Sequence, residues 1–283
     1  MAYLDHIRAC NAHDLSGFRD FRVAGSCVGR VRHAFAERLA EHRDLVSVGP
    51  QAVDLLPCFT ETAARTAAVS ELLDRLIAVG VIPPKRGELY PVLTAWGMPP
   101  LLLIDRGAVS YFGIAAFGLH VNGFVCHPDG LHLWIGVRAR DRSVAPGKLD
   151  NLIAGGQPAG LSLEDNLIKE AAEEAGLDPE TARRAKPAGA ITYVMETPPG
   201  LKVDCLFVYD LELDPAVMPC NTDGEVESFE LMPWRKVAGI VRDTMDFKFN
   251  CNLVIIDFLI RHGLITPDEP DYLELCQGRT RRI

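Results

Sequence analysis

Residues 154–177 read AGGQPAGLSLEDNLIKEAAEEAGL, and the interpretation of the whole chain starts from this stretch. Two adjacent glycines open it, and glycine lets the backbone come close to a ligand. Ser162 is a typical N-cap residue, and Asp165 three residues later can complete a capping box. Gly176 is typical of the left-handed residue that ends a helix. The stretch therefore predicts a glycine-rich loop followed by a helix over Leu163–Ala175.

Three glutamates of this helix, Glu170, Glu173 and Glu174, are spaced so that their carboxylates share one face. Like charges at this spacing repel each other, and acidic groups near a helix C-terminus oppose the helix dipole. A solvated acidic face tolerates such repulsion, whereas a bound hard cation such as Mg²⁺ converts it into coordination. The glycine pair before the helix favours the second interpretation, because exposed backbone carbonyls there can add oxygen ligands.

The composition is that of an ordinary globular protein. The chain has 283 residues, 48% apolar and 24% charged, which excludes a mainly disordered, collagen-like or coiled-coil protein. Its formal net charge of −9 argues against a general nucleic-acid binder, which normally carries a basic face. The most apolar stretch, residues 101–126, contains charged side chains and four glycines, so no membrane span is expected.

Cysteine usage and the chain ends suggest a location. The eight cysteines are widely scattered, and no two have the C-x-x-C spacing of a zinc site or redox motif. They are expected to be buried, reduced thiols. The first residues lack the basic segment and apolar run of a secretory signal peptide. Together these features predict a cytoplasmic protein, and the basic ending GRTRRI is expected to be a solvated tail.

Hydrophobic spacing divides the chain into two parts. Up to about residue 80 it predicts mostly helix, and from about residue 116 it predicts mixed strands and helices. Helices are expected over 31–42, 63–79 and 250–261, and strands over 89–93, 117–126, 131–138, 190–196, 203–213 and 226–232. We therefore place a domain boundary at about residue 115.

The stretch 154–177 resembles the Nudix box, G-x5-E-x7-R-E-U-x-E-E-x-G-U, in which U is a bulky aliphatic residue. The spacing fits without an insertion. Three positions depart: Leu161 replaces the first glutamate, Lys169 the arginine and Ala171 an aliphatic residue. Lysine lacks the planar fork with which arginine holds a carboxylate through two hydrogen bonds. We expect these departures to affect the rate more than metal binding, because the three helical glutamates remain.

Segments outside the box resemble one subgroup of this family. They are similar to the Nudix half of fungal thiamine pyrophosphokinase and its stand-alone plant and bacterial relatives, which carry an extra N-terminal domain. The segments are RGE at 86–88, YFGI at 111–114, GLHVNG at 118–123, LWI at 133–135 and PGKLDN at 146–151. The resemblance implies an α/β fold: a smaller α+β N-terminal domain over 1–115, a Nudix α/β/α sandwich with a mixed β-sheet over 116–265, and a tail over 266–283.

The resemblance also implies a MutT-like, metal-dependent hydrolase of diphosphates. Glu170, Glu173 and Glu174 would be catalytic and would bind Mg²⁺ or Mn²⁺, together with the backbone carbonyl of Ala154. In this group an acid from the loop before a late strand often joins the metal or acts as a base. Glu225 is our choice for that acid, although a solvated loop acid is the alternative.

Cationic groups are needed for the substrate phosphates. Arg138 and Lys148, just before the box, are the candidates. Alternate residues of a strand share one face, so arginines there could contact phosphate, although exposed strand charges are an equal alternative. No histidine is assigned to the metal, since the chemistry requires oxygen ligands.

The subgroup resemblance implies thiamine diphosphate or its oxidised derivatives as substrate, cleaved to the monophosphate. A nucleoside diphosphate derivative such as ADP-ribose is the alternative substrate. A non-enzymatic ligand-binding scaffold and an isomerase are the alternative functions. The expected partner is a small-molecule diphosphate, without nucleic acid or membrane, and a homodimer is left open. A flat heterocycle needs an aromatic platform, for which the candidates are Trp96, Tyr111, Phe117 and Tyr193.

Overall fold

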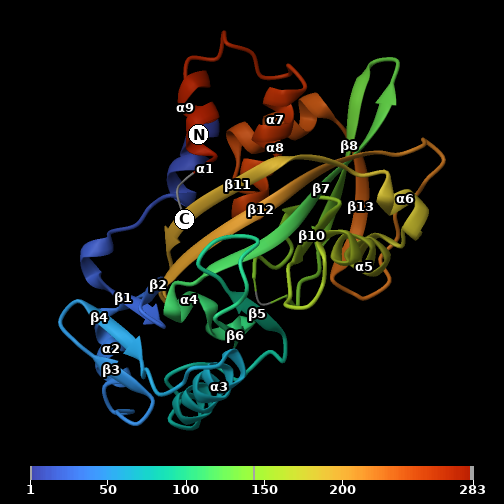
Figure 1. The fold of residues 1–283 in the computed structure, drawn as a ribbon. Helices are drawn as coiled ribbons and strands as arrows, with labels where there is room; N and C mark the ends of the chain where they lie inside the picture. Colours follow the sequence, from blue (N-terminus) through green and yellow to red (C-terminus); the bar gives the residue numbers. More distant parts are fainter. Residues whose placement is uncertain (1, 143, 281–283) are drawn as a thin grey trace.

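The computed structural model describes residues 2–142 and 144–280, and its largest element is a mixed β-sheet (Figure 1). Five strands follow the order β11-β12-β7-β8-β13, while β10 pairs with β7 and β9 with β8. β7 and β12 are parallel, and the other pairs are antiparallel. The strands are β7 (Ala115–His127), β8 (Gly130–Arg138), β9 (Leu149–Asp150), β10 (Ile153–Gly156), β11 (Lys186–Glu196), β12 (Leu201–Glu212) and β13 (Val226–Pro233). The strands predicted in this half of the chain are confirmed.

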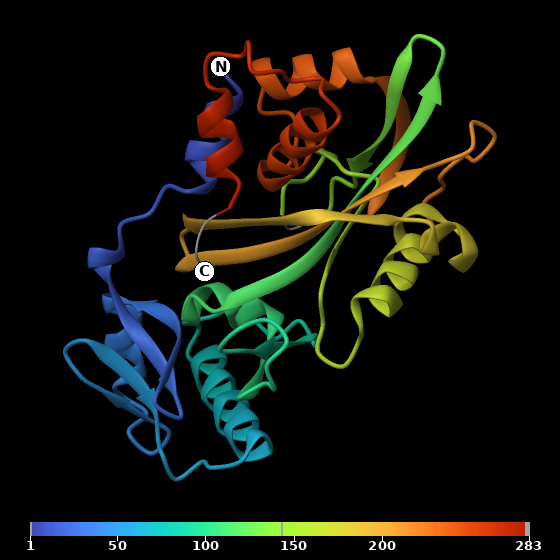
Figure 2. The ribbon, with the colours of Figure 1, turned by 45° about the horizontal axis from the view of Figure 1, so that its top comes forward.

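Helices cover both faces of this sheet, as Figure 2 shows. α5 (Leu163–Ala175) and α6 (Pro179–Arg183) lie on one face, and α7 (Trp234–Asp243) and α8 (Phe249–Arg261) lie on the other. Side chains alternate along β7, so Leu119 packs in the core under α5 and Phe124 in the core under α8. The predicted α/β/α sandwich with a mixed sheet is confirmed.

The earlier part of the chain folds around a second sheet, in the order β2-β1-β4-β3. Its elements are η1 (Leu15–Gly17), β1 (Phe18–Val23), β2 (Ser26–Arg32), α2 (His33–Leu39), β3 (Val46–Val48), β4 (Ala52–Leu55) and α3 (Thr62–Ala78). A hairpin and two short helices follow: β5 (Leu89–Val92), β6 (Leu102–Asp105), η2 (Arg106–Ala108) and α4 (Val109–Phe112). The helices predicted over 31–42 and 63–79 are confirmed as α2 and α3. The prediction that the segment up to residue 80 is mostly helical is wrong, because strands this short carry too few alternating residues to be recognised.

The two ends of the chain meet on the sandwich (Figure 1). α1 (Tyr3–Cys10) packs against α8 and against α9 (Tyr272–Gly278). The Tyr3 hydroxyl donates to the carbonyl of Ala238, and Arg279 forms an ion pair with Asp257. The expected solvated ending is therefore wrong for Arg279, whereas residues 281–283 lie outside the described residues. The division of the chain into domains stays a prediction.

Cysteine burial differs from the expectation. Four cysteines are exposed, which contradicts the prediction of buried thiols at those positions: Cys27, Cys58, Cys126 and Cys220. Within the described part of the chain, no helix combines the length and apolarity needed to cross a membrane.

Candidate active site

Helix α5 forms for the local reasons that the sequence predicts. The Ser162 hydroxyl accepts a hydrogen bond from the backbone N of Asp165 at 3.1 Å and donates to the Asp165 carboxylate at 2.6 Å. Gly176 ends the helix in the left-handed conformation, with φ of 63°. Leu167 and Ala171 are buried against the sheet. This packing holds the glutamate-bearing helix directly against β10.

The glutamates of α5 adjoin the glycine-rich loop. Glu174 is 6% exposed, and its Oε2 accepts a hydrogen bond from the backbone N of Ala154 at 2.7 Å. A Cβ atom at Gly155 would lie 2.4 Å from Cδ of Glu170, so this position must be glycine if Glu170 is to keep its place. Glu173 is more exposed. The structure therefore brings Glu170, Glu174 and the backbone at Ala154 together.

Burial disfavours the charged form of the glutamates in this cluster. It raises the pKa of Glu174 to about 8, and it is the largest cause of the raised pKa of Glu170. Lys169 offers partial compensation, since its Nζ lies 3.2 Å from Oε1 of Glu170 and 2.6 Å from Oε2 of Glu173. Carboxylate and carbonyl oxygens are the donors that hard divalent cations prefer. The residues present therefore fit such a cation, and their assignment as its ligands stays a prediction.

Glu225 lies at the edge of the same cluster. It precedes β13 and lines the cavity described below. Its Oε2 is 2.7 Å from Nη2 of Arg142. After burial and the charge of Glu173, the charge of Glu225 also raises the pKa of Glu170. The structure thus places the predicted loop acid near the glutamates, and its catalytic role stays a prediction.

The two cations predicted for phosphate binding are engaged elsewhere. Arg138 is buried, and its Nη1 donates to Oδ2 of Asp150 at 2.7 Å. The same guanidinium also donates to the carbonyl of Val144. Nζ of Lys148 donates to the carbonyl of Met245 at 2.8 Å. Arg138 lines the cavity but Lys148 does not, so their contact with phosphate stays a prediction that the geometry favours little.

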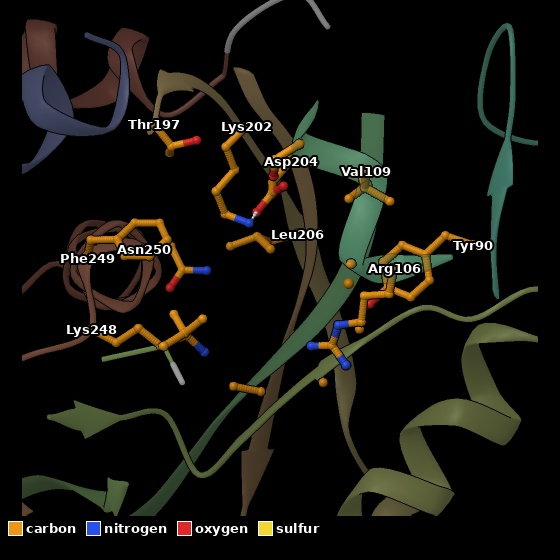
Figure 3. A pocket seen from close by; sticks show the side chains of 18 of the residues that line it. Tyr90, Arg106, Val109, Thr197, Lys202, Asp204, Leu206, Lys248, Phe249 and Asn250 are labelled. Carbon is orange, nitrogen blue, oxygen red and sulfur yellow. Dashed lines mark ion pairs between the residues drawn. The ribbon is translucent and has the colours of Figure 1, made fainter. Parts of the chain in front are cut away.

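A cavity of about 420 Å³ opens over the glycine-rich loop, and both parts of the chain line it. Figure 3 shows Lys202, Asp204 and Asn250 on one side, and Tyr90 and Arg106 across from them. Asp204 and Asn250 are 7% and 5% exposed, so both are buried polar groups on the cavity wall. None of these five residues was predicted as a site residue, because they are separated along the chain and belong to no short motif.

The predicted aromatic platforms have different positions. Tyr111 and Phe117 line the cavity. The ring of Trp96 packs on that of Phe117, with centroids 4.7 Å apart. Tyr193 is fully buried, and its hydroxyl donates to Asp204 at 2.5 Å. Tyr111 and Phe117 are therefore the two candidates that can touch a ligand directly.

A second cluster of potential metal ligands adjoins the cavity, which one of its members, His120, also lines. One ligand atom from each of His120, Asp150 and Cys251 lies within 4.8 Å of the others, and all three residues are buried. Asp150 already binds two protein cations, Arg138 at 2.7 Å and Lys248 at 3.1 Å. Burial also raises the pKa of the Cys251 thiol well above its usual range. Two protein cations already occupy the carboxylate of Asp150 and the thiol stays protonated, so no metal is assigned here.

His120 in this cluster predicts an acid-sensitive stability. Burial, reinforced by Lys248, lowers its pKa to about 4 from 6.5. Asp150 and Asp204 oppose this shift. Between these pH values the unfolded chain binds more protons than the folded one, so stability falls as the pH falls. We expect a loss of about 2 kcal/mol between pH 7 and about pH 5 from this residue.

Urea unfolding at several pH values measures this loss. The slope of the unfolding free energy against pH is proportional to the number of protons taken up on unfolding. In the variant His120→Gln this number should be smaller by up to one in the same pH range. Equal slopes in the two proteins would show that His120 does not titrate as described.

The chain is similar to several known proteins. A family model described as "Domain of unknown function (DUF4743)" matches residues 2–116. "Nudix hydrolase 20, chloroplastic" of Arabidopsis thaliana is 41% identical over 291 residues, which cover 99% of this chain and 78% of that protein. The chain belongs to the Nudix hydrolase family. "Nudix hydrolase 24, chloroplastic" of the same plant is 41% identical over 277 residues, covering 96% of this chain and 76% of that one.

A solved structure gives a weaker likeness. The NUDIX domain of Shewanella oneidensis NrtR, complexed with ADP ribose, is 15% identical, with a TM-score of 0.43 over 56% of this chain and 94% of that one. The family membership therefore rests on the sequence relatives.

Family membership decides several predictions. The protein is a Nudix pyrophosphohydrolase, as the sequence predicts, and enzymes of this family generally use divalent metal ions. The predicted cytoplasmic location is contradicted, because both Arabidopsis relatives are named as chloroplastic. A test for a secretory signal pattern does not address a plastid, so it could not support that location. The finer resemblance to thiamine pyrophosphokinase stays a prediction.

Proposed function

We propose that this Nudix hydrolase cleaves the diphosphate of thiamine diphosphate or its oxidised derivatives and leaves the monophosphate. The observation that carries the proposal is one cavity lined by Glu225, by a buried polar wall and by the glycine-rich loop. Behind the loop, Glu170 and Glu174 contact Gly155 and Ala154. At about 420 Å³, the cavity is at the small end of the usual range for ligand sites. A compact heterocycle with a terminal diphosphate suits this volume better than a molecule with two riboses.

The wall far from the glutamates suits a nitrogen-containing ring. Asp204 offers carboxylate oxygens, and Asn250 offers both an amide donor and an acceptor. Lys202 holds Asp204 in place, with Nζ 2.9 Å from Oδ2. Phe117 and Leu206 supply apolar lining between this wall and the loop. Such a mixture of apolar surface and a few fixed polar groups is typical of a site that orients a small ligand.

The residues of α5 and the loop would hold the divalent cation, Mg²⁺ or Mn²⁺. When bound, the cation neutralises charge on the phosphoryl oxygens. Glu170, Glu173 and Glu174 supply the carboxylates, and Lys169 keeps two of them oriented. Glu225 would accept the proton of the attacking water as the oxygen bonds to phosphorus. The bridging P–O bond then breaks, and the bridging oxygen leaves with the monophosphate.

Leu161 occupies the box position of the missing glutamate. Its side chain is 39% exposed, and its carbonyl accepts a hydrogen bond from the Gln157 side chain at 2.8 Å. The loop is therefore fixed by a polar contact that does not need a carboxylate at 161. This arrangement supports activity despite the departure from the box.

A substrate panel tests the proposal through its products. Cleavage of thiamine diphosphate or its oxidised forms releases orthophosphate, whereas cleavage of ADP-ribose releases AMP and ribose 5-phosphate. We expect orthophosphate release with Mg²⁺ or Mn²⁺, its loss with EDTA, and a higher kcat/KM for the thiamine compounds. A higher kcat/KM for ADP-ribose would replace the substrate assignment, and no cleavage of any diphosphate would favour a ligand-binding scaffold.

A further inference from the structure

The cavity holds basic side chains of unequal availability. Among the described residues, six line it: Arg86, Arg106, Arg138, Arg142, Lys202 and Lys248. Arg138 and Lys248 share Asp150 and are largely buried. Arg142 and Lys202 pair with acids that themselves line the cavity, Glu225 and Asp204. Each of these four side chains thus already has an acidic partner at or behind the wall.

Arg106 differs from these four. Its Nη1 donates to Oε2 of Glu88 at 2.8 Å, and Glu88 is not one of the residues that line the cavity. The side chain is 44% exposed. A guanidinium carries five N–H donors, so the pair with Glu88 leaves most of them directed elsewhere. Arg106 therefore presents a charge-assisted donor group to the cavity.

Arg106 is positioned by its packing against Tyr90 and the glycine-rich loop at Gly156. The hydroxyl of Tyr90 packs so closely on Gly156 that a Cβ there would lie 1.7 Å from it. The guanidinium carbon of Arg106 is 5.7 Å from the centre of the Tyr90 ring, and 3.7 Å from the same Cβ position at Gly156. The guanidinium is thus beside the glycine-rich loop, one residue from the glycine that contacts Glu170.

The backbone that carries Arg106 is also held rigidly. Asp105 is 4% exposed. Its carboxylate accepts hydrogen bonds from the backbone N atoms of Arg86, Gly87 and Gly107, at 3.0, 2.9 and 2.8 Å. A hydrogen bond of 2.8 Å from Ala159 N to the carbonyl of Leu89 joins this hairpin to the loop. These hydrogen bonds hold the backbone at the base of the Arg106 side chain in place.

We propose that Arg106 is a substrate-binding residue that contacts the diphosphate, so that the N-terminal part of the chain completes the active site. The proposal rests on the proposed function, because it assumes a diphosphate substrate. The planar guanidinium can bind two phosphate oxygens at once. It lies across the cavity from Lys202 and Asp204 (Figure 3), so it would reach the diphosphate from that side. A substrate held by Arg106 at its diphosphate and by the opposite wall at its ring would have one phosphorus atom fixed next to the glutamates.

The test is binding of inorganic pyrophosphate to the full chain, measured by calorimetric titration with Mg²⁺ and with EDTA. The variant Arg106→Gln should bind at least about tenfold more weakly in both conditions, as expected for a lost charge-assisted pair. Arg106→Lys should recover part of the loss, since it keeps the charge. The matched control is Arg75→Gln, an arginine of the same part of the chain that pairs with Asp44 and Glu71; it should bind like the unaltered protein.

Glu88→Gln separates contact from structure. If Arg106 contacts phosphate, removing its competitor should leave pyrophosphate binding equal or tighter. Equal weakening in Glu88→Gln and Arg106→Gln would show that only the ion pair matters, and it would overturn the proposal. Unchanged binding in Arg106→Gln, or no pyrophosphate binding by the unaltered protein, would overturn it as well. This binding measurement needs no turnover. If the protein binds pyrophosphate through Arg106 but hydrolyses no diphosphate, only the proposed function is refuted.

Discussion

Replacing Glu174 with glutamine is expected to lower kcat by roughly 10²- to 10³-fold, the scale of removing one strong electrostatic contribution to the transition state. Glu174 is the most buried carboxylate of the cluster and touches the loop backbone at Ala154. Glutamine keeps an oxygen that can accept the hydrogen bond from Ala154 N, so the loop should keep its shape. What is lost is the ability to carry a negative charge toward a bound cation. Initial rates at saturating substrate and metal measure the effect.

The matched control for this prediction is Glu164→Gln on the same helix. Glu164 is exposed in the first turn, where it pairs with Arg183, and its loss should leave the rate within about twofold because exposed pairs contribute little. Near-normal turnover in Glu174→Gln would contradict the metal assignment. Equal loss in both variants would indicate a general effect on α5 rather than a role for this carboxylate.

Replacing Asp150 with asparagine is expected to destabilise the fold by about 3–5 kcal/mol, the usual cost of removing one partner from a buried ion pair. Asp150 is 4% exposed and binds both Arg138 and Lys248. These cations, together with His120, outweigh burial and lower the pKa of Asp150 to about 2. The neutral amide would leave two buried cations without a counter-charge. Urea unfolding at neutral pH measures the change.

Two further variants make this prediction specific. Asp44→Asn removes an exposed carboxylate that also pairs with an arginine, and it should leave the free energy of unfolding almost unchanged, because exposed pairs contribute little. The double variant Asp150→Asn with Arg138→Met should regain part of the lost stability, because one uncompensated cation is removed with its former partner. A cost below about 1 kcal/mol for Asp150→Asn alone would mean that water reaches these charges.

The parts of the site that the sequence predicted are those that lie close together along the chain. The loop, the cap at Ser162, the helix end at Gly176 and the shared face of the glutamates depend on spacing within one helix. Helical geometry converts that spacing directly into positions. The long strands of the second half were predictable for the same reason, since alternation over many residues is a strong signal.

The errors came from short elements and from distant partners. The small N-terminal sheet was missed because its strands are only a few residues long. Arg138 was chosen for phosphate by its position on a strand, but in the folded chain Asp150 holds it. Which carboxylate a buried cation meets depends on packing between strands, and no local pattern records that.

By itself, the sequence determined that a glycine loop and an acidic helix stand next to each other in this protein, because both belong to one continuous segment with helical spacing. Only the tertiary structure decided which side chains surround them. Arg106, Lys202, Asp204 and Asn250 come from distant segments and meet at one cavity. Their neighbourhood is set by the packing of the N-terminal hairpin and α8 around the sheet, and such contacts between distant segments depend on the whole fold rather than on any local pattern.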